Sequence, residues 1–289
     1  MFGLLNLDKP AGVTSRDVVN RVQRLVRPEK VGHAGTLDPL ATGVLVVGIG
    51  PATRLVEYVQ RMAKTYRGTF LLGRTSDTED IEGQVRELTG PPVPTCDQMQ
   101  SALPRFVGTI EQSPPAYSAL RVAGQRAYDL ARKGEAVELA PRAIEIFSLE
   151  LLSYDYPELT LLVRCGSGTY VRTLGRDIAR SLGTDAVMSA LRREAIGGFS
   201  VTTALPAEAI TLESIQASLL PPILAVGDMP QIVVSGDEAR RLMQGQPIAN
   251  RWHTSAEELA AVSLEDRFVA IVAPLGDGKL RATKSFSHG

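Results

Sequence analysis

The chain has 289 residues, of which 44% are hydrophobic and 22% are charged, and its formal net charge is −1. This composition is typical of an ordinary globular protein with one large or two modest domains. The sequence start lacks the features of a signal peptide and no apolar run is long enough to span a membrane, so we expect a cytoplasmic protein without membrane contact. Cys96 and Cys165 are too few and too far apart for a zinc site or a disulfide framework.

The charge is unevenly distributed along the chain. Residues 1–74 carry eleven Lys/Arg against five Asp/Glu, and residues 164–193 carry six against two. Residues 75–100 have the opposite balance, with one basic residue against six acidic ones. This asymmetry is compatible with a basic RNA-facing surface and an acidic region elsewhere, although a solvated exterior would give similar counts.

The first predicted helix covers residues 15–27. Apolar side chains at the spacing of one helical face are Val18, Val19, Val22, Leu25 and Val26. Thr14 or Ser15 can cap the start of this helix, and Pro28 prevents its continuation. The helix therefore has one face suited to packing against a core.

A glycine-punctuated loop over residues 32–43 precedes a predicted buried strand, VLVVGIG, at residues 44–50. The loop carries one carboxylate, Asp38, and the ring of Pro39 biases that residue towards an extended backbone. Asp38 could therefore be a nucleophile or a general acid or base. It could equally be a turn residue, because Asp and Pro are both favoured in turns.

The middle of the chain alternates predicted strands and helices. Strands are predicted at residues 66–73, 144–152 and 159–165, and helices at 55–62, 99–106, 125–133, 170–182 and 186–193. Residues 75–83 are polar and predict a loop. On the helix at 170–182, Arg172, Arg176 and Arg180 stand four residues apart, away from the apolar stripe, and the last two are interpreted as exposed helix arginines.

A proline-rich stretch from Pro221 to Pro230 marks the predicted domain boundary, giving domains at 1–226 and 227–289. The second domain contains predicted strands at 232–234, 268–273 and 280–286 and a helix at 237–244. These elements suit a small β-rich module.

Five segments together resemble, in order, the motifs of the TruB family of pseudouridine synthases. They are NLDKPAGVTS at 6–15, GHAGTLDPLATG at 32–43, KTY at 64–66, SPPAYSAL at 113–120 and CGSGTYVRT at 165–173. Five ordered matches over about the first 200 residues are far more specific than a single one.

The resemblance implies an α/β fold of the α+β type. It predicts a catalytic domain with a mixed, largely antiparallel sheet, followed by a small PUA-like RNA-binding domain. The implied activity is conversion of the uridine at position 55, in the T loop of tRNA, to pseudouridine. The bond from N1 to C1′ breaks, the uracil rotates and C5 joins C1′, with no cofactor or metal. The implied partner is the T stem-loop of tRNA, without a guide RNA, and we expect a monomer.

The resemblance also assigns site residues. Asp38 would be the catalytic carboxylate, acting at C1′, at C6 or through a glycal, and Arg172 would hold it ionised and aimed. Tyr66 would stack on the flipped uracil, as the removal of a base from its stack requires, and Tyr170 and Leu191 would line the pocket. Without the resemblance, these two tyrosines and the leucine would be interpreted as core residues.

The resemblance also assigns roles to three further sets of residues, for which a purely structural role is a close alternative. His33 would contact the T loop and help to hold it open, where a lone loop histidine would otherwise be a hydrogen-bonding residue. Lys9 would support the pocket or contact a phosphate, or be merely solvated. Tyr117 and Ser118 could position the substrate loop, with a structural role preferred.

Three rival functions remain in view. A guide-RNA-dependent synthase is disfavoured by the absence of long basic tails, and activity on tRNA without a guide would distinguish the two. A tRNA-remodelling protein with secondary or lost catalysis is disfavoured by the intact Asp38, Tyr66 and Arg172. A phosphate-binding loop at 32–43 fails because it lacks the Lys-Ser/Thr that such loops use.

Overall fold

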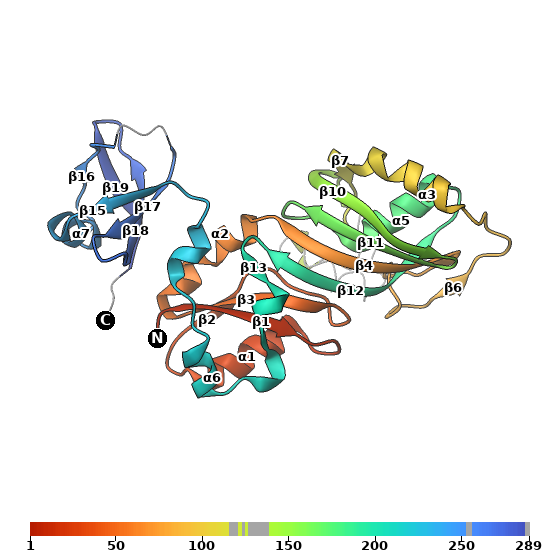
Figure 1. The fold of residues 1–289 in the computed structure, drawn as a ribbon, viewed down its shortest axis with the longest axis horizontal. Helices are drawn as coiled ribbons and strands as arrows, with labels where there is room; N and C mark the ends of the chain where they lie inside the picture. The colour runs from red at the N-terminus through yellow and green to blue at the C-terminus, as the bar shows by residue number, and fades with distance from the viewer. Residues whose placement is uncertain (116–120, 123–124, 127–138, 253–255, 287–289) are drawn as a thin grey trace.

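The computed structural model describes residues 1–115, 121–122, 125–126, 139–252 and 256–286. Within these ranges the chain forms one large mixed sheet and a separate five-stranded C-terminal sheet (Figure 1). This arrangement confirms the predicted α+β fold with a β-rich C-terminal unit. No helix in the described ranges is long and apolar enough to span a membrane.

The large sheet runs in the order β14-β1-β3-β12-β4-β11-β10-β7 across the described residues. Its strands are β1 (Gly3–Lys9), β3 (Thr42–Ile49), β4 (Lys64–Leu72), β7 (Gly108–Gln112), β10 (Arg142–Asp155), β11 (Glu158–Cys165), β12 (Ala186–Ile196) and β14 (Leu205–Pro206). The short strands β2 (Val31–His33) and β13 (Phe199–Ser200) pair with β3 and β12. Neighbours on this path pair antiparallel except β14 with β1 and β12 with β3, which are parallel.

The strand β3 is apolar throughout because both of its faces are covered. Leu45, Val47 and Ile49 pack with helices α1 (Ser15–Leu25) and α6 (Leu212–Ala217), which lie together beside β1 and β3 (Figure 1). Val44 and Val46 point to the other face, into a second cluster. The predicted strand at residues 44–50 is therefore confirmed.

Helix α1 begins where its sequence predicts. Thr14 accepts a hydrogen bond from the Asp17 amide, and the Asp17 carboxylate accepts one from the Thr14 amide, which forms a capping box. The valines at the predicted face are buried, whereas Leu25 at the last turn is exposed. The structure thus selects Thr14 as the cap and leaves Ser15 inside the helix.

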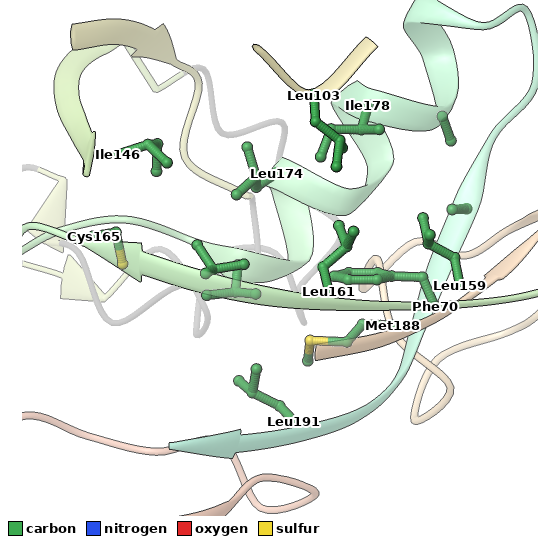
Figure 2. Packing of buried hydrophobic residues seen from close by; sticks show 14 of the residues in the cluster. Phe70, Leu103, Ile146, Leu159, Leu161, Cys165, Leu174, Ile178, Met188 and Leu191 are labelled. Carbon is green, nitrogen blue, oxygen red and sulfur yellow. The ribbon is translucent and has the colours of Figure 1, made fainter. Parts of the chain in front are cut away.

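Helix α5 (Val171–Ser181) covers the other half of the sheet. Figure 2 shows Leu174 and Ile178 of α5 over Leu161 of β11 and Phe70 of β4, in one buried cluster. Phe70 reaches the helix because position 175 is glycine, where an added Cβ would lie 2.0 Å from a ring carbon. This close packing fixes α5, and with it the residues at its N-terminal end.

The predicted helix at residues 186–193 is wrong, because this segment belongs to strand β12. Its Ala, Met, Leu and Arg residues favour a helix locally, but the segment lies between β3 and β4 and pairs with both. After an irregularity between Met188 and Ala190, Leu191 and Arg193 alternate inward with period two. The sheet therefore overrides the local propensity.

The remaining short elements include the helices predicted at residues 55–62 and 99–106, and the sequence did not predict the others. The full set is η1 (Gly50–Leu55), α2 (Val56–Arg61), β5 (Arg74–Thr75), β6 (Arg86–Glu87), α3 (Cys96–Ala102), η2 (Leu103–Phe106), η3 (Val201–Thr203), η4 (Ala207–Ala209) and η5 (Pro222–Val226). The helix predicted at 125–133 is wrong at its first two residues, where β9 (Gln125–Arg126) pairs with β8 (Arg121–Val122). Its remaining residues, like Tyr117 and Ser118, lie outside the described ranges.

The C-terminal unit contains a sheet in the order β15-β17-β18-β19-β16. Its elements are β15 (Gln231–Val234), α7 (Gly236–Met243), β16 (Ile248–Ala249), β17 (Leu259–Ser263), β18 (Phe268–Pro274) and β19 (Lys279–Ser285). It contacts the first part of the chain through Phe286, whose ring stacks on Phe2, and through a hydrogen bond from Tyr58 to Glu258. The domain division between residues 226 and 227 stays a prediction.

Candidate active site

The ends of four strands meet at one place in the large sheet. The start of β4, with Lys64 and Tyr66, pairs with the ends of β11 and β12, and the end of β12 pairs with the start of β3 at Gly43. The loop that carries Asp38 leads directly into β3, and α5 begins shortly after β11. Residues far apart in the sequence are thereby gathered around Asp38.

Asp38 occupies a turn. The amide of Ala41 donates to the Asp38 carbonyl at 3.0 Å, and Pro39 fills the second position of this turn. The neighbouring Leu37 is held on both sides by Ser15, whose Oγ accepts from the Leu37 amide at 2.9 Å and donates to its carbonyl. The turn interpretation of Asp38 is thus correct, and it is compatible with a chemical role, since the carboxylate remains 38% exposed.

The side chain of Lys9 supports the backbone of the loop that carries Asp38. Its ammonium is completely buried and donates to the carbonyls of Pro10, Val13 and Pro39. Burial lowers the pKa of Lys9 to about 8, and the nearby Asp38 carboxylate opposes this effect. Of the interpretations given for Lys9, the contacts favour support of the loop, and a solvated lysine is excluded.

Arg193 ties the two ends of the loop together. Its Nε donates to the carbonyl of Val44 at 2.7 Å and its Nη2 to that of Gly35 at 3.1 Å. Only 1% of this residue is exposed. Gly43, between these two carbonyls, has a φ of +100°, and an added Cβ there would lie 2.2 Å from the Arg193 carbonyl oxygen. The loop backbone is therefore fixed by the end of β12.

Asp38 belongs to a chain of three charges. Its Oδ2 lies 3.2 Å from Nε of Arg172, and Nη1 of Arg172 lies 3.0 Å from Oδ2 of Asp80. The same Nη1 donates to the Thr78 carbonyl at 2.7 Å. The Arg172 and Asp80 side chains are only 8% and 4% exposed, so their hydrogen bonds fix the guanidinium that faces Asp38.

The acidic loop at 75–83 docks on α5 and β12. Glu79 accepts from Thr173 at 2.7 Å and pairs with Arg176, and its backbone carbonyl accepts from the Met188 amide, whose own carbonyl accepts from the Ile81 amide. Burial raises the pKa of Glu79, while Arg176 and Thr173 lower it. The interpretation of Arg176 as an exposed helix arginine is wrong, whereas Arg180 is exposed and pairs with Asp185.

Tyr66 and Tyr170 line one cavity of about 240 Å³, whose wall also includes Gly35 and Thr36 of the loop that carries Asp38. Burial raises the pKa of Tyr66, and the Arg193 guanidinium opposes this effect. The backbone of Tyr170 is held by the Gln112 side chain, which accepts from its amide at 2.8 Å and donates to its carbonyl at 3.1 Å. Both tyrosines are partly exposed, so they are not closed core residues.

Leu191 and His33 flank the site without joining the charge chain. Leu191 is 8% exposed and belongs to the cluster under α5, where it lies apart from Phe70 (Figure 2). His33 ends β2, five residues before Asp38, and burial lowers the pKa of its imidazole. The ring is therefore neutral near pH 7.

Sequence reasoning did not single out Asp80, Arg193 or Gln112. Asp80 lies in the stretch interpreted as an acidic region away from the RNA, and its burial depends on α5. Arg193 follows Leu191 by two residues, which would have indicated a shared face if the segment had been predicted as a strand. Gln112 directly precedes the Ser-Pro-Pro motif at 113–115. A glutamine at this position gives no sign in the sequence that its side chain binds the backbone of Tyr170.

Residues able to hold a metal are not gathered in this part of the molecule. Among the described residues, no group of three or more His, Cys, Asp or Glu side chains could hold a metal ion. Asp38 instead pairs with Arg172, which also pairs with Asp80.

Comparison with known proteins identifies the family. Residues 23–171 match the model of the TruB family pseudouridylate synthase N-terminal domain. A protein of Dehalococcoides mccartyi named tRNA pseudouridine synthase B is 40% identical over 292 residues, which cover 99% of this chain and 97% of the relative. A protein of Caulobacter vibrioides with the same name is 44% identical over 251 residues, covering 85% and 81%.

Solved structures support the same conclusion. The structure titled a Cbf5-Nop10-Gar1 complex contains a chain with a TM-score of 0.76 and 26% identity, covering 99% of this chain and 84% of that one. A chain in an H/ACA RNP bound to a substrate RNA containing 2′-deoxyuridine has a TM-score of 0.75 and 25% identity, covering 99% and 86%. With this fold, and with the sequence match over nearly its whole length, the chain belongs to the TruB family of pseudouridylate synthases.

Proposed function

We propose that this protein is a tRNA pseudouridine synthase that isomerises the T-loop uridine at position 55, with Asp38 as its catalytic carboxylate. The observation that carries the proposal is the ion pair between Asp38 and Arg172, at 3.2 Å, on a loop that is braced from several sides. The relatives named tRNA pseudouridine synthase B support tRNA as the substrate.

The geometry suits a carboxylate that must approach ribose C1′ and the uracil ring. Arg172 aims the Asp38 carboxylate and balances its charge, and Asp80 keeps the guanidinium from turning away. The preorganised pair needs no rearrangement when the substrate arrives. Asp38 would act at C1′, at C6 or through a glycal. The N1–C1′ bond is exchanged for a C5–C1′ bond, C5 loses its proton and N1 takes one up.

The aromatic residues would receive the base. Tyr66 presents a partly exposed ring beside the loop and would stack on the uracil after it leaves the RNA stack. Tyr170 and Leu191 would complete the pocket walls. His33 would contact the T loop as a neutral ring, and Lys9 would act by holding Pro39.

The remaining proposals concern partners. We expect the tRNA T stem-loop to be sufficient as substrate without a guide RNA, the C-terminal unit to add RNA contacts, and the protein to act as a cytoplasmic monomer without a cofactor. All residues of the charge chain come from one chain, which supports the monomer. Analytical ultracentrifugation with and without tRNA measures the oligomeric state.

The decisive experiment is tritium release from an unmodified tRNA transcript labelled at uridine C5. We expect release equivalent to one uridine per tRNA from the wild type, and a loss of more than about 10⁴-fold in Asp38→Asn with tRNA binding retained. Asp97→Asn, an exposed carboxylate on α3, is the matched control and should retain full activity.

Two outcomes would contradict the proposal. Tight tRNA binding by the wild type without tritium release would favour the tRNA-remodelling function. Release that requires an added guide RNA would favour the guide-dependent synthase.

A further inference from the structure

The cavity beside Tyr66 and Tyr170 has an unusual charge for a site that would face a neutral base. Among the described residues, its charged lining consists of Lys64, Arg142 and Arg193, without a carboxylate. The loop at 166–169 forms another part of the wall through small residues. The cavity is thus a cationic hollow that opens beside the proposed uracil platform.

Two of the three cations are buried. Lys64 is 6% exposed and Arg193 is 1% exposed, although such side chains are rarely buried without an acidic partner. Lys64 donates to the carbonyl of Gln60, and Arg193 donates to backbone carbonyls. Within the described residues, neither forms an ion pair with a carboxylate. Burial lowers the pKa of Lys64 to about 8, and the Arg193 charge adds to this effect.

The third cation, Arg142, is only partly buried. The Arg142 guanidinium lies 5.1 Å from the centre of the Tyr170 ring and donates to the Gly168 carbonyl. No carboxylate of the described residues pairs with it either. Three positive charges therefore converge on a space in which the described residues supply no balancing carboxylate.

We propose that this cavity is a phosphate subsite, which binds a phosphodiester of the RNA strand next to the target uridine. The inference rests on the proposed function. Uracil is neutral and cannot balance the three cations, whereas the RNA backbone carries one negative charge per nucleotide. Because Tyr66 lines the cavity and would also stack on the target base, the bound phosphate belongs to a nucleotide adjacent to that base.

The first test neutralises single phosphates of a T stem-loop RNA as methylphosphonates. Binding is measured with Asp38→Asn protein, so that the RNA stays unmodified. We expect neutralisation of one linkage beside the target uridine to weaken binding about tenfold or more. In the Arg142→Gln background the same linkage should have a much smaller effect, because its partner is already weakened.

The control for this test is Arg105→Gln, an exposed arginine on η2 that does not line the cavity. It should leave the profile across all linkages unchanged. If neutralising each linkage weakens binding equally in the Arg142→Gln background and without it, the subsite assignment is overturned.

The second test asks whether Lys64 serves the fold or the ligand. In Lys64→Met the uncompensated buried charge is removed, so we expect the Tm at pH 7 to be unchanged or higher. The KM for tRNA should rise about tenfold or more, with kcat changed by less than about threefold. A fall in Tm with an unchanged KM would assign Lys64 to the fold and contradict the proposal.

The two proposals fail separately. Absence of tritium release from the wild type would overturn the synthase function, while the methylphosphonate profile could still reveal the subsite. Normal tritium release together with a methylphosphonate profile that Arg142→Gln does not change would overturn the subsite alone.

Discussion

Nε of Arg172 lies 3.2 Å from Oδ2 of Asp38, and the arginine is at the buried start of α5 while the aspartate is on a partly exposed loop. The guanidinium is therefore the fixed member of the pair. It is fixed because its Nη1 is held by Asp80 and by the Thr78 carbonyl. The aim of Asp38 consequently depends on the loop at residues 75–83, which carries both Thr78 and Asp80.

Replacement of Asp80 tests this dependence. In Asp80→Asn the charge opposite Arg172 is lost but the shape is kept, so one of the contacts that fix its Nη1 is weakened while the Thr78 carbonyl remains. We expect kcat for tritium release to fall about 10- to 100-fold, with KM for tRNA nearly unchanged. Glu87→Gln, an exposed carboxylate on β6, is the control and should behave like the wild type. An unchanged kcat in Asp80→Asn would show that the charge of Asp80 is not needed to hold Arg172.

Replacement of Arg193 tests the support of the loop. Arg193→Met removes two hydrogen bonds and leaves the carbonyls of Gly35 and Val44 buried without these donors. We expect the free energy of unfolding to fall by about 2 to 4 kcal/mol and the tritium-release rate to fall with it. Arg193→Lys retains one donor group and should recover part of both losses. Equal stability of the wild type and Arg193→Met in urea unfolding would contradict this account.

Replacement of Gly175 tests the packing under α5. An added Cβ would lie 2.0 to 2.6 Å from three atoms of the Phe70 ring, so α5 or the ring must move. We expect Gly175→Ala to lower the free energy of unfolding by about 1 to 3 kcal/mol. Gly198→Ala, where an added Cβ meets nothing within 4 Å, is the matched control. Similar urea midpoints for both variants would refute the close packing.

The pH dependence of stability provides a test of Lys64. Burial lowers its pKa from 10.5 to about 8, so the unfolded chain holds this proton more tightly than the native protein. The destabilising effect is complete below pH 8 and fades as the pH approaches 10.5. This pKa difference corresponds to about 3 to 4 kcal/mol, against which the lost hydrogen bond to Gln60 costs about 1 kcal/mol.

We therefore expect Lys64→Met to be more stable than the wild type at pH 7, with an advantage that shrinks between pH 8 and 10. Urea unfolding of both proteins across this range measures the difference, in which the titration of a shared group such as Tyr58 cancels. An advantage that grows with pH would have the wrong sign for a lysine with a lowered pKa.

The sequence by itself determined the elements whose signals are local. The valines of α1 and the Thr14 cap act within a few residues, and the apolar run of β3 shows burial on both faces without reference to its neighbours. The motif resemblance likewise placed Asp38, Tyr66 and Arg172 in one site. The pair between Asp38 and Arg172 then follows the predicted relationship.

Only the tertiary structure decided which long-range partners each residue has. The segment at 186–193 contains good helix formers, yet it becomes a strand because β3 and β4 both offer it backbone hydrogen bonds. Asp80 is 92 residues from Arg172 in the sequence, and Arg193 is 149 residues from Val44. Charge type alone gives no partner across such distances, since the burial that makes these contacts strong exists only in the folded chain.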